Sequence, residues 1–148
     1  MKEGYRNLDI YNLAHQLALQ IHKMTLSLPK FEMYEEGSQI RRSAKSVSSQ
    51  IVEGYCLRKN KNEFLQYLTR THATCEETIE HLDYLFETGS LKDQMLFEHL
   101  RNEYLTLSKQ IFRFTQGVYS QHDKPNYLKE PSENVPSLNN DVNFNPES

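Results

Sequence analysis

The sequence of 148 residues has little of several residue types, and each shortage excludes a class of protein. Its 5 glycines and 5 prolines are too few for a collagen-like or low-complexity chain. No apolar run approaches the roughly 18 residues of a membrane span, and the first residues lack the apolar core of a signal peptide. The two cysteines, Cys56 and Cys75, form neither a CxxC pair nor a zinc-binding spacing. We therefore expect one soluble domain in a reducing, cytosolic setting, with no membrane partner.

The charged residues are segregated, although the formal net charge is only −3. Residues 41–61 hold six basic residues and one acid, whereas residues 62–89 hold six acids and one base. Residues 121–148 add five acids and two bases. A dedicated nucleic-acid binder is usually basic as a whole, so composition does not favour that class. The cluster in residues 41–61 leaves a local basic patch open.

Four segments carry apolar residues at alternating steps of three and four, the spacing of one face of a helix. They predict helices at about residues 10–28, 39–54, 62–87 and 91–118. The connections between the second, third and fourth segments are short, which forces neighbouring helices to be antiparallel. No segment shows a strand pattern. The sequence therefore predicts an all-α fold, an antiparallel up-down-up-down four-helix bundle, over residues 1–120.

Capping residues set the expected ends of these helices. Asp9, Ser38 and Ser90 are the expected N-caps of the first, second and fourth helices. Asn60 opens a capping box for the third helix, three residues before a glutamate. Gly54 stands where a left-handed residue would end the second helix. Beyond the helices, residues 121–148 are acidic, rich in proline and asparagine and poor in apolar residues, so we expect a disordered tail.

The apolar surface exceeds what one bundle needs. The third helix carries a second apolar stripe of Leu65, Ile79 and Phe86 beside its main one. Several tyrosines fall off or beside the core stripes: Tyr5, Tyr11, Tyr55, Tyr67 and Tyr84. Surplus apolar and aromatic surface on a soluble domain favours contact with another copy. The alternative is that these tyrosines cover the bundle with their hydroxyls in water.

Motifs that carry catalysis are missing from the sequence. It has no Glu-x-x-His, HExxH, GxSxG or glycine-rich phosphate loop. His72, Glu76 and Glu80 share one helix face, but one helix supplies too few ligands for a tight metal site, and a solvated charged face is the preferred interpretation. Cys56 lies near two basic residues, which lower a thiol pKa, but a catalytic role is disfavoured. We expect no catalytic residue, no cofactor and no metal site.

The stretch from Gln39 to Gly54, QIRRSAKSVSSQIVEG, resembles the signature of the four helix bundle protein family, also called the 23S rRNA intervening-sequence proteins. The positions that fit are Gln39, Arg41, Arg42, Ser46, Ile51, Glu53 and Gly54. The sequence departs from the signature at Ser43, Gln50 and Val52, and it has Ala73 and Thr74 where the family carries a Gly-Ser pair. Glu77 retains the glutamate that follows. The resemblance spans roughly residues 5–118.

This resemblance implies an antiparallel four-helix bundle that assembles as a ring, typically a homopentamer. The role of the family is largely undefined. A related branch assists the reverse transcriptase of diversity-generating retroelements and binds nucleic acid through a basic ring surface. That branch is markedly basic, and the present sequence is not.

The signature residues and the basic cluster are the two candidate sites. Gln39, Arg42, Ser46 and Glu53 step along one helix face, and Arg42 can pair with Glu77 of the third helix across a bundle or subunit seam. With Gly54 they form the structural signature. The candidate nucleic-acid patch consists of Arg41, Lys45, Arg58, Lys59 and Lys61.

Two functions follow from these sites. The preferred one is a non-enzymatic oligomeric scaffold or adaptor, whose partners are copies of itself and another protein. The alternative is an accessory protein that binds RNA or DNA weakly and in a salt-dependent way, associated with rRNA or with a retroelement reverse transcriptase.

Overall fold

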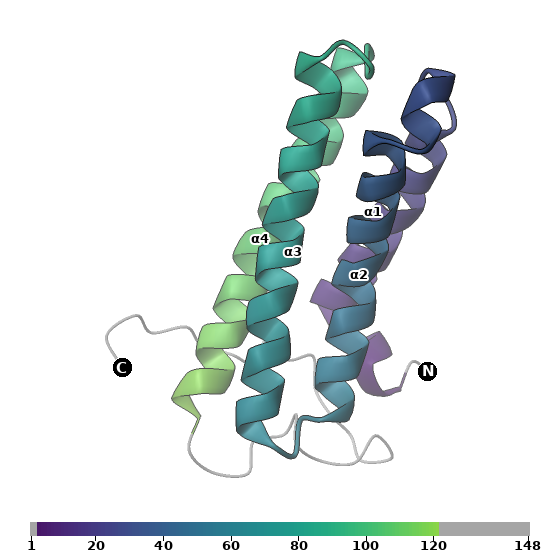
Figure 1. Cartoon of the computed structure of the whole chain (residues 1–148). Helices are drawn as coiled ribbons and strands as arrows, with labels where there is room; N and C mark the ends of the chain where they lie inside the picture. Colours follow the sequence, from purple (N-terminus) through teal and green to yellow (C-terminus); the bar gives the residue numbers. More distant parts are fainter. Residues whose placement is uncertain (1–2, 122–148) are drawn as a thin grey trace.

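The computed structural model describes residues 3–121, which form four α-helices, two short 3-10 helices and no strand. The elements are η1 (Gly4–Asn7), α1 (Asp9–Thr25), η2 (Lys30–Met33), α2 (Glu36–Cys56), α3 (Lys61–Glu87) and α4 (Gln94–Ser120). Figure 1 shows the α-helices side by side, with α1 and α2 on one side and α3 and α4 on the other. The all-helical prediction is confirmed for this part of the chain. The predicted disorder of the acidic tail concerns residues that lie, apart from Gln121, outside it.

The core lies between the four helices and is built from the predicted stripes. Helix α2 packs against α1 and α3, and α4 packs against α3 and α1. All four stripe residues of α2 are buried: Ile40, Ala44, Val47 and Ile51. So are the stripe residues of α3 and those of α4 from Leu100 onward. Burying each large aliphatic or aromatic side chain contributes about 1.5–3 kcal/mol, so these stripes hold the helices together.

The structure corrects the ends of the first two helices. Leu8, not Asp9, occupies the N-cap of α1, and α1 ends at Thr25 rather than at residue 28. Helix α2 begins at Glu36, so the predicted N-cap Ser38 lies inside it. The reason is that η2 folds back onto the first turn of α2. A Cβ atom at Gly37 would lie only 2.4 Å from the Glu32 carbonyl oxygen, so glycine is required there.

Gly54 does not end α2 as predicted. The helix continues to Cys56, and Gly54 lacks a left-handed conformation. A Cβ atom at Gly54 would lie 2.9 Å from the Cβ atom of Tyr67. The glycine is therefore needed for the close approach of α2 and α3.

The caps of α3 and α4 have opposite outcomes. The N-cap at Asn60 is confirmed, because its side-chain oxygen accepts a hydrogen bond from the Glu63 N–H at 3.2 Å. The reciprocal half of the predicted capping box is not formed, because the Asn60 N–H donates to the Leu57 carbonyl. The prediction at Ser90 is wrong: α4 begins three residues later, with Asp93 accepting from the Leu96 N–H at 3.0 Å. Leu91 is buried and its N–H bonds back to the carbonyl of Leu85, which holds this stretch in a turn.

Part of the surplus aromatic surface is used within the chain. The centre of the Tyr5 ring lies 4.9 Å from the centre of the Tyr11 ring and 6.4 Å from that of the Tyr55 ring, in edge-to-face arrangements. Tyr55 is fully buried, whereas Tyr84 stays exposed. These contacts weaken the argument from tyrosine positions for an oligomer. No helix within residues 3–121 is long and apolar enough to cross a membrane.

Candidate functional site

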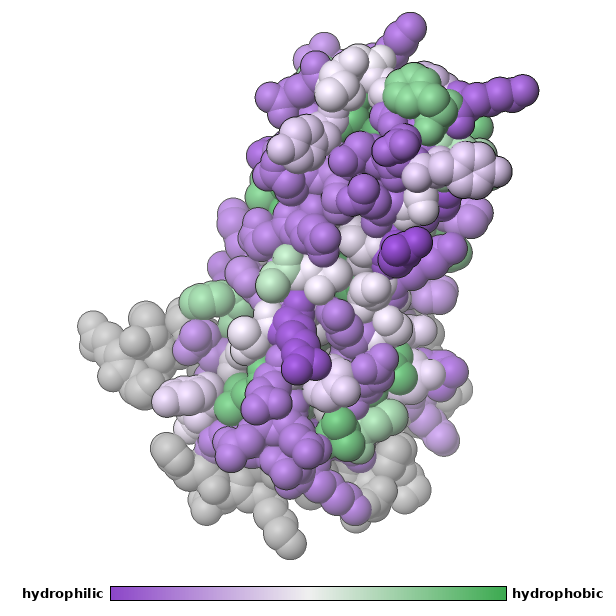
Figure 2. All heavy atoms as spheres, viewed as in Figure 1, coloured by the Kyte–Doolittle hydropathy of each residue, from purple (hydrophilic) through white to green (hydrophobic). Residues whose placement is uncertain are grey.

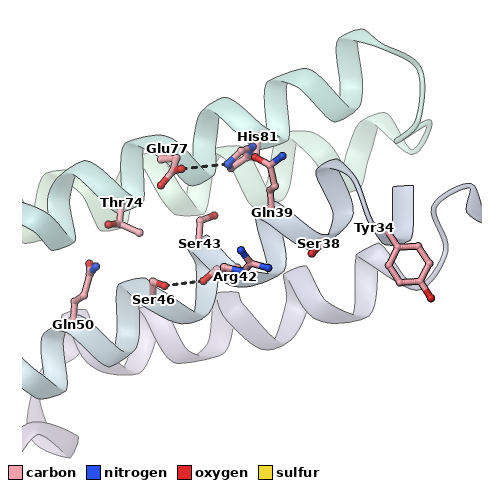
Figure 3. A pocket seen from close by; sticks show the side chains of 10 residues that line it. All are labelled: Tyr34, Ser38, Gln39, Arg42, Ser43, Ser46, Gln50, Thr74, Glu77 and His81. Carbon is pink, nitrogen blue, oxygen red and sulfur yellow. Dashed lines mark hydrogen bonds and ion pairs between the residues drawn. The ribbon is translucent and has the colours of Figure 1, made fainter. Parts of the chain in front are cut away.

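Four residues of the structural signature line a groove of about 500 Å³ between α2 and α3. Helix α2 contributes Gln39, Arg42 and Ser46 to its wall, and α3 contributes Glu77. Figure 3 shows these side chains on the two facing helices, with Tyr34 at one end. We call this hollow the signature groove. The face over α2 and α3 is mostly hydrophilic, with scattered hydrophobic side chains (Figure 2).

Small side chains create the hollow. Ser43 of α2 is a buried lining residue, and its hydroxyl accepts a hydrogen bond at 3.0 Å from the hydroxyl of Thr78, a buried residue of α3. Both hydroxyls also have carbonyl partners within their own helices, whereas Gln50 Oε1, at another lining residue of the groove, is buried without a hydrogen-bond partner among residues 3–121. Ser43 is one of the positions at which this sequence departs from the family signature. Its hydroxyl supplies an interhelical hydrogen bond that sequence reasoning missed.

Arg42 lies on the wall of the groove without a charged partner. Its side chain is exposed, and its guanidinium makes no ion pair or hydrogen bond within the part of the chain that the structure covers. Glu77, its expected partner, instead lies 3.6 Å from His81 Nε2. The predicted Arg42–Glu77 pair is therefore not formed inside this chain, and a pair between two copies stays a prediction.

His81 is a residue of the site that sequence reasoning missed. Its side chain is only 10 % exposed and lies between two carboxylates. Nδ1 is 2.7 Å from Glu36 Oε2 at the start of α2, and Nε2 faces Glu77 on the same helix. The contact between Nδ1 and Glu36 joins α3 to α2. The spacing of Glu77 and His81, four residues apart on a helix, was the available signal.

Glu53 and Gly54 do not belong to the groove. Glu53 is exposed in the last turns of α2, and Gly54 faces Tyr67. The signature therefore has two parts: residues that line a groove, and a glycine that lets two helices approach.

The candidate nucleic-acid residues do not form one cluster. Helix α2 has 21 residues, about 30 Å of axis. Arg41 lies near its start, whereas Arg58, Lys59 and Lys61 come after its end. Arg41 Nη2 donates to the Met33 carbonyl at 2.7 Å. Arg58 is 5 % exposed and donates to the Tyr55 carbonyl at 3.0 Å, with its guanidinium 4.0 Å from the centre of the Tyr55 ring.

The remaining three residues are Lys61, which contacts the chain itself, and the exposed Lys45 and Lys59. Lys61 Nζ donates to the Tyr119 carbonyl at 3.0 Å and to that of Gln121, at the end of α4. Only Lys45 and Lys59 of the five are exposed. Arg41, Arg58 and Lys61 therefore make contacts that stabilise the chain itself.

The other titratable residues considered from sequence lie apart from the groove. No group of three or more His, Cys, Asp or Glu within residues 3–121 is placed to hold a metal ion. His72 and Glu76 instead contact Ser108 of α4, at 3.2 and 2.5 Å. In a catalytic triad the acid contacts the histidine nitrogen remote from the serine, whereas here Glu76 contacts the serine itself. Glu80 is exposed.

The two cysteines differ in environment. Cys75 is buried, with its Sγ 3.6 Å from the Tyr104 carbonyl, and burial raises its pKa to about 12, with the Glu76 charge adding to the shift. A thiol with so high a pKa stays protonated and unreactive. Cys56 is exposed in the last turn of α2.

Comparison with known proteins identifies the family. The model of the 23S rRNA-intervening sequence protein family matches residues 6–113, which include the signature groove and most of the four helices. A search of curated proteins gives no match. The matched part is well over half of the chain, and the chain belongs to the 23S rRNA-intervening sequence protein family.

Proposed function

We propose that this protein is a non-enzymatic scaffold that assembles with copies of itself through the signature groove. In this proposal the helices alternate up and down as a four-helix bundle, and the copies close into a ring, with five as the expected number. The observation that carries it is the Arg42 guanidinium, which lies unpaired in a polar groove.

The groove has the chemistry of an interface. Arginine and tyrosine are enriched where proteins bind one another, and Tyr34 at the end of the groove is 88 % exposed. A guanidinium presents a planar fork of donors that suits a carboxylate. The complementary group on a second copy is an acidic side chain, which the acid-rich α3 supplies in number.

The groove offers little for catalysis. His81 is the side chain in it that would serve as a general base, but both of its nitrogens face carboxylates of the same chain. A base needs a nitrogen directed at the substrate. A binding role therefore suits these residues better than a catalytic one.

Light scattering on the purified full chain tests the proposal. The wild-type protein is expected to have a mass several times that of one chain, and Arg42→Ala a smaller one. Lys45→Ala is the matched control, because Lys45 is an exposed base on the same helix that does not line the groove. A monomeric wild type, or an Arg42→Ala variant of unchanged mass, would contradict the proposal.

Nucleic-acid binding is the second candidate, favoured by the exposure of Lys45 and Lys59 and by the repetition of both in a ring. The test is the salt dependence of binding to a short RNA. If these lysines contact phosphates, changing both to alanine flattens the slope of log affinity against log salt by about one per contact. Arg41, Arg58 and Lys61 are left unchanged because they stabilise the chain. Lys23→Ala on α1 is the control, and an unchanged slope in the double variant would reject this function.

A further inference from the structure

A second groove, of about 510 Å³, lies at the end of the molecule where η2 meets the last turn of α3. The end of α3 that contributes to it lies near the upper end of the helices in Figure 1. Its wall carries three carboxylates, Glu32, Glu35 and Glu36, and two aromatic side chains, Phe31 and Tyr84. We call it the acidic groove. It shares no lining residue with the signature groove.

Glu32 gives the groove its unusual character. The residue is only 4 % exposed, and its carboxylate makes no ion pair or hydrogen bond with any residue that the structure covers. The nearby Arg41 donates a hydrogen bond from Nη2 to the Met33 carbonyl and forms no ion pair with Glu32. The carboxylate oxygens of Glu32 are not among the fully buried side-chain atoms that lack a partner, and the residue lines the groove, so a cation in the groove can pair with them.

The rest of the wall indicates which kind of cation fits. Phe31 and Tyr84 are 65 % and 51 % exposed, so their ring faces are open to a ligand. Cations are attracted to aromatic faces, and a guanidinium also stacks on them. Glu36 already accepts from His81, which leaves Glu32 and Glu35 for the ligand. No set of three acidic ligands within residues 3–121 is close enough to hold a metal ion, which favours an extended cation.

We propose that the acidic groove binds an arginine side chain presented by a basic segment of a partner protein. The guanidinium pairs with the carboxylates of Glu32 and Glu35 and stacks on an aromatic ring beside them. Two carboxylates and a ring within one groove match the fork of donors and the flat face of arginine. This site goes beyond the proposed self-assembly, which uses the other groove.

An NMR titration of the full chain tests this site. The probe is a blocked pentapeptide with a central arginine between glycines, compared with the same peptide carrying citrulline, which keeps the shape and lacks the charge. The arginine peptide is expected to shift the amide signals of Phe31, Glu35 and Tyr84, and the citrulline peptide to leave them unchanged. Glu35→Gln should weaken binding about tenfold, the loss expected for one charge-assisted contact.

Two further variants keep the test decisive. Glu32→Gln should weaken binding similarly, and Glu35, being exposed, serves as the variant that folds if Glu32→Gln does not. Glu63→Gln, an exposed acid at the far end of α3, is the matched control and should bind normally. Equal shifts from the citrulline peptide, unchanged affinity in Glu35→Gln, or no shift at all would overturn the proposal. So would a loss of assembly mass in Glu35→Gln without peptide binding, since the occupant would then be another copy of the chain.

Discussion

Individual small and buried residues decide how α2 and α3 meet. Gly54 has no Cβ atom where Tyr67 approaches, and the Thr78 hydroxyl donates a hydrogen bond to that of Ser43 across the same pair of helices. The effect of each position depends on the residue that packing places opposite it.

Gly54→Ala should destabilise the fold. Alanine gains about 1 kcal/mol of helix propensity over glycine, but the new methyl group would lie 2.9 Å from a backbone-anchored Cβ atom, and overpacking costs about 1–3 kcal/mol. A net loss of about 1 kcal/mol is expected in urea unfolding. Ser49→Ala, exposed on the same helix, should be neutral or stabilising. A more stable Gly54→Ala protein would show that the contact with Tyr67 relaxes freely.

Buried titratable groups should make the protein less stable at high pH. The pKa of Cys75 rises from 9.0 to about 12 on burial, and burial also raises that of Tyr104 above its ordinary 10.0. Above pH 9.0 the unfolded chain releases the thiol proton while the folded chain keeps it. The free energy of unfolding therefore falls as pH rises, by up to about 1.4 kcal/mol per unit and per group, and this loss is absent below that pH.

Urea unfolding at about pH 8 and 10 measures this fall, since that range brackets the ordinary thiol pKa. Cys75→Ala should reduce the pH dependence, whereas Cys56→Ala, at an exposed position, should leave it as in the wild type. Identical pH dependence in the two variants would mean that the Cys75 thiol ionises in the folded protein.

At the scale of elements, the helix ends depend on which side chain reaches the free backbone N–H groups. Asn60 accepts from Glu63 at the start of α3, and Asp93 accepts from Leu96 at the start of α4. Both Ser90 and Asp93 are good capping residues by type. The burial of Leu91 selects Asp93, because it keeps the residues before α4 in a turn.

Asp93→Ala should therefore cost about 1 kcal/mol of stability, the typical loss for a cap, and Ser90→Ala much less. Thermal and urea unfolding of the two variants provide the measurement. The reverse order of effects would place the start of α4 at Ser90, where the sequence pattern had predicted it.

At the scale of the whole molecule, specific polar contacts join distant parts of the chain. Lys61 at the start of α3 donates to carbonyls at the end of α4, and His81 of α3 lies against Glu36 of α2. These contacts connect residues 58 and 45 positions apart. The apolar core holds the same helices together, and these polar contacts position charged side chains that are not part of that core.

Lys61→Met should loosen the last turn of α4. The substitution keeps much of the apolar stem and removes the ammonium that satisfies the terminal carbonyls. Hydrogen exchange by the amides of the last turn of α4 is expected to be several-fold faster, with the rest of the helix unchanged. Lys109→Met, an exposed lysine in the middle of α4, is the control. Equal exchange in both variants would show that the Lys61 contact contributes nothing in solution.

The sequence alone determined the four helices, their buried faces and the cap at Asn60, because helical period and capping depend on residues within one or two turns of each other. It also placed Gln39, Arg42 and Ser46 on one face. Only the tertiary structure decided what those residues face. Glu77 lies against His81, and Gly54 packs against Tyr67 instead of ending a helix. The register between helices, which no local pattern encodes, brings such distant residues together.

The contacts of the basic residues and of the acidic groove also depend on distant segments of the chain. Arg41, Arg58 and Lys61 looked like a solvent-facing cluster because charge is visible in sequence and its partners are not. Nothing in the sequence distinguishes Glu32 from the other acids, and only the fold buries it beside the end of α3. Burial and pairing are properties of the packed chain, because they depend on which distant segments exclude water from a given side chain.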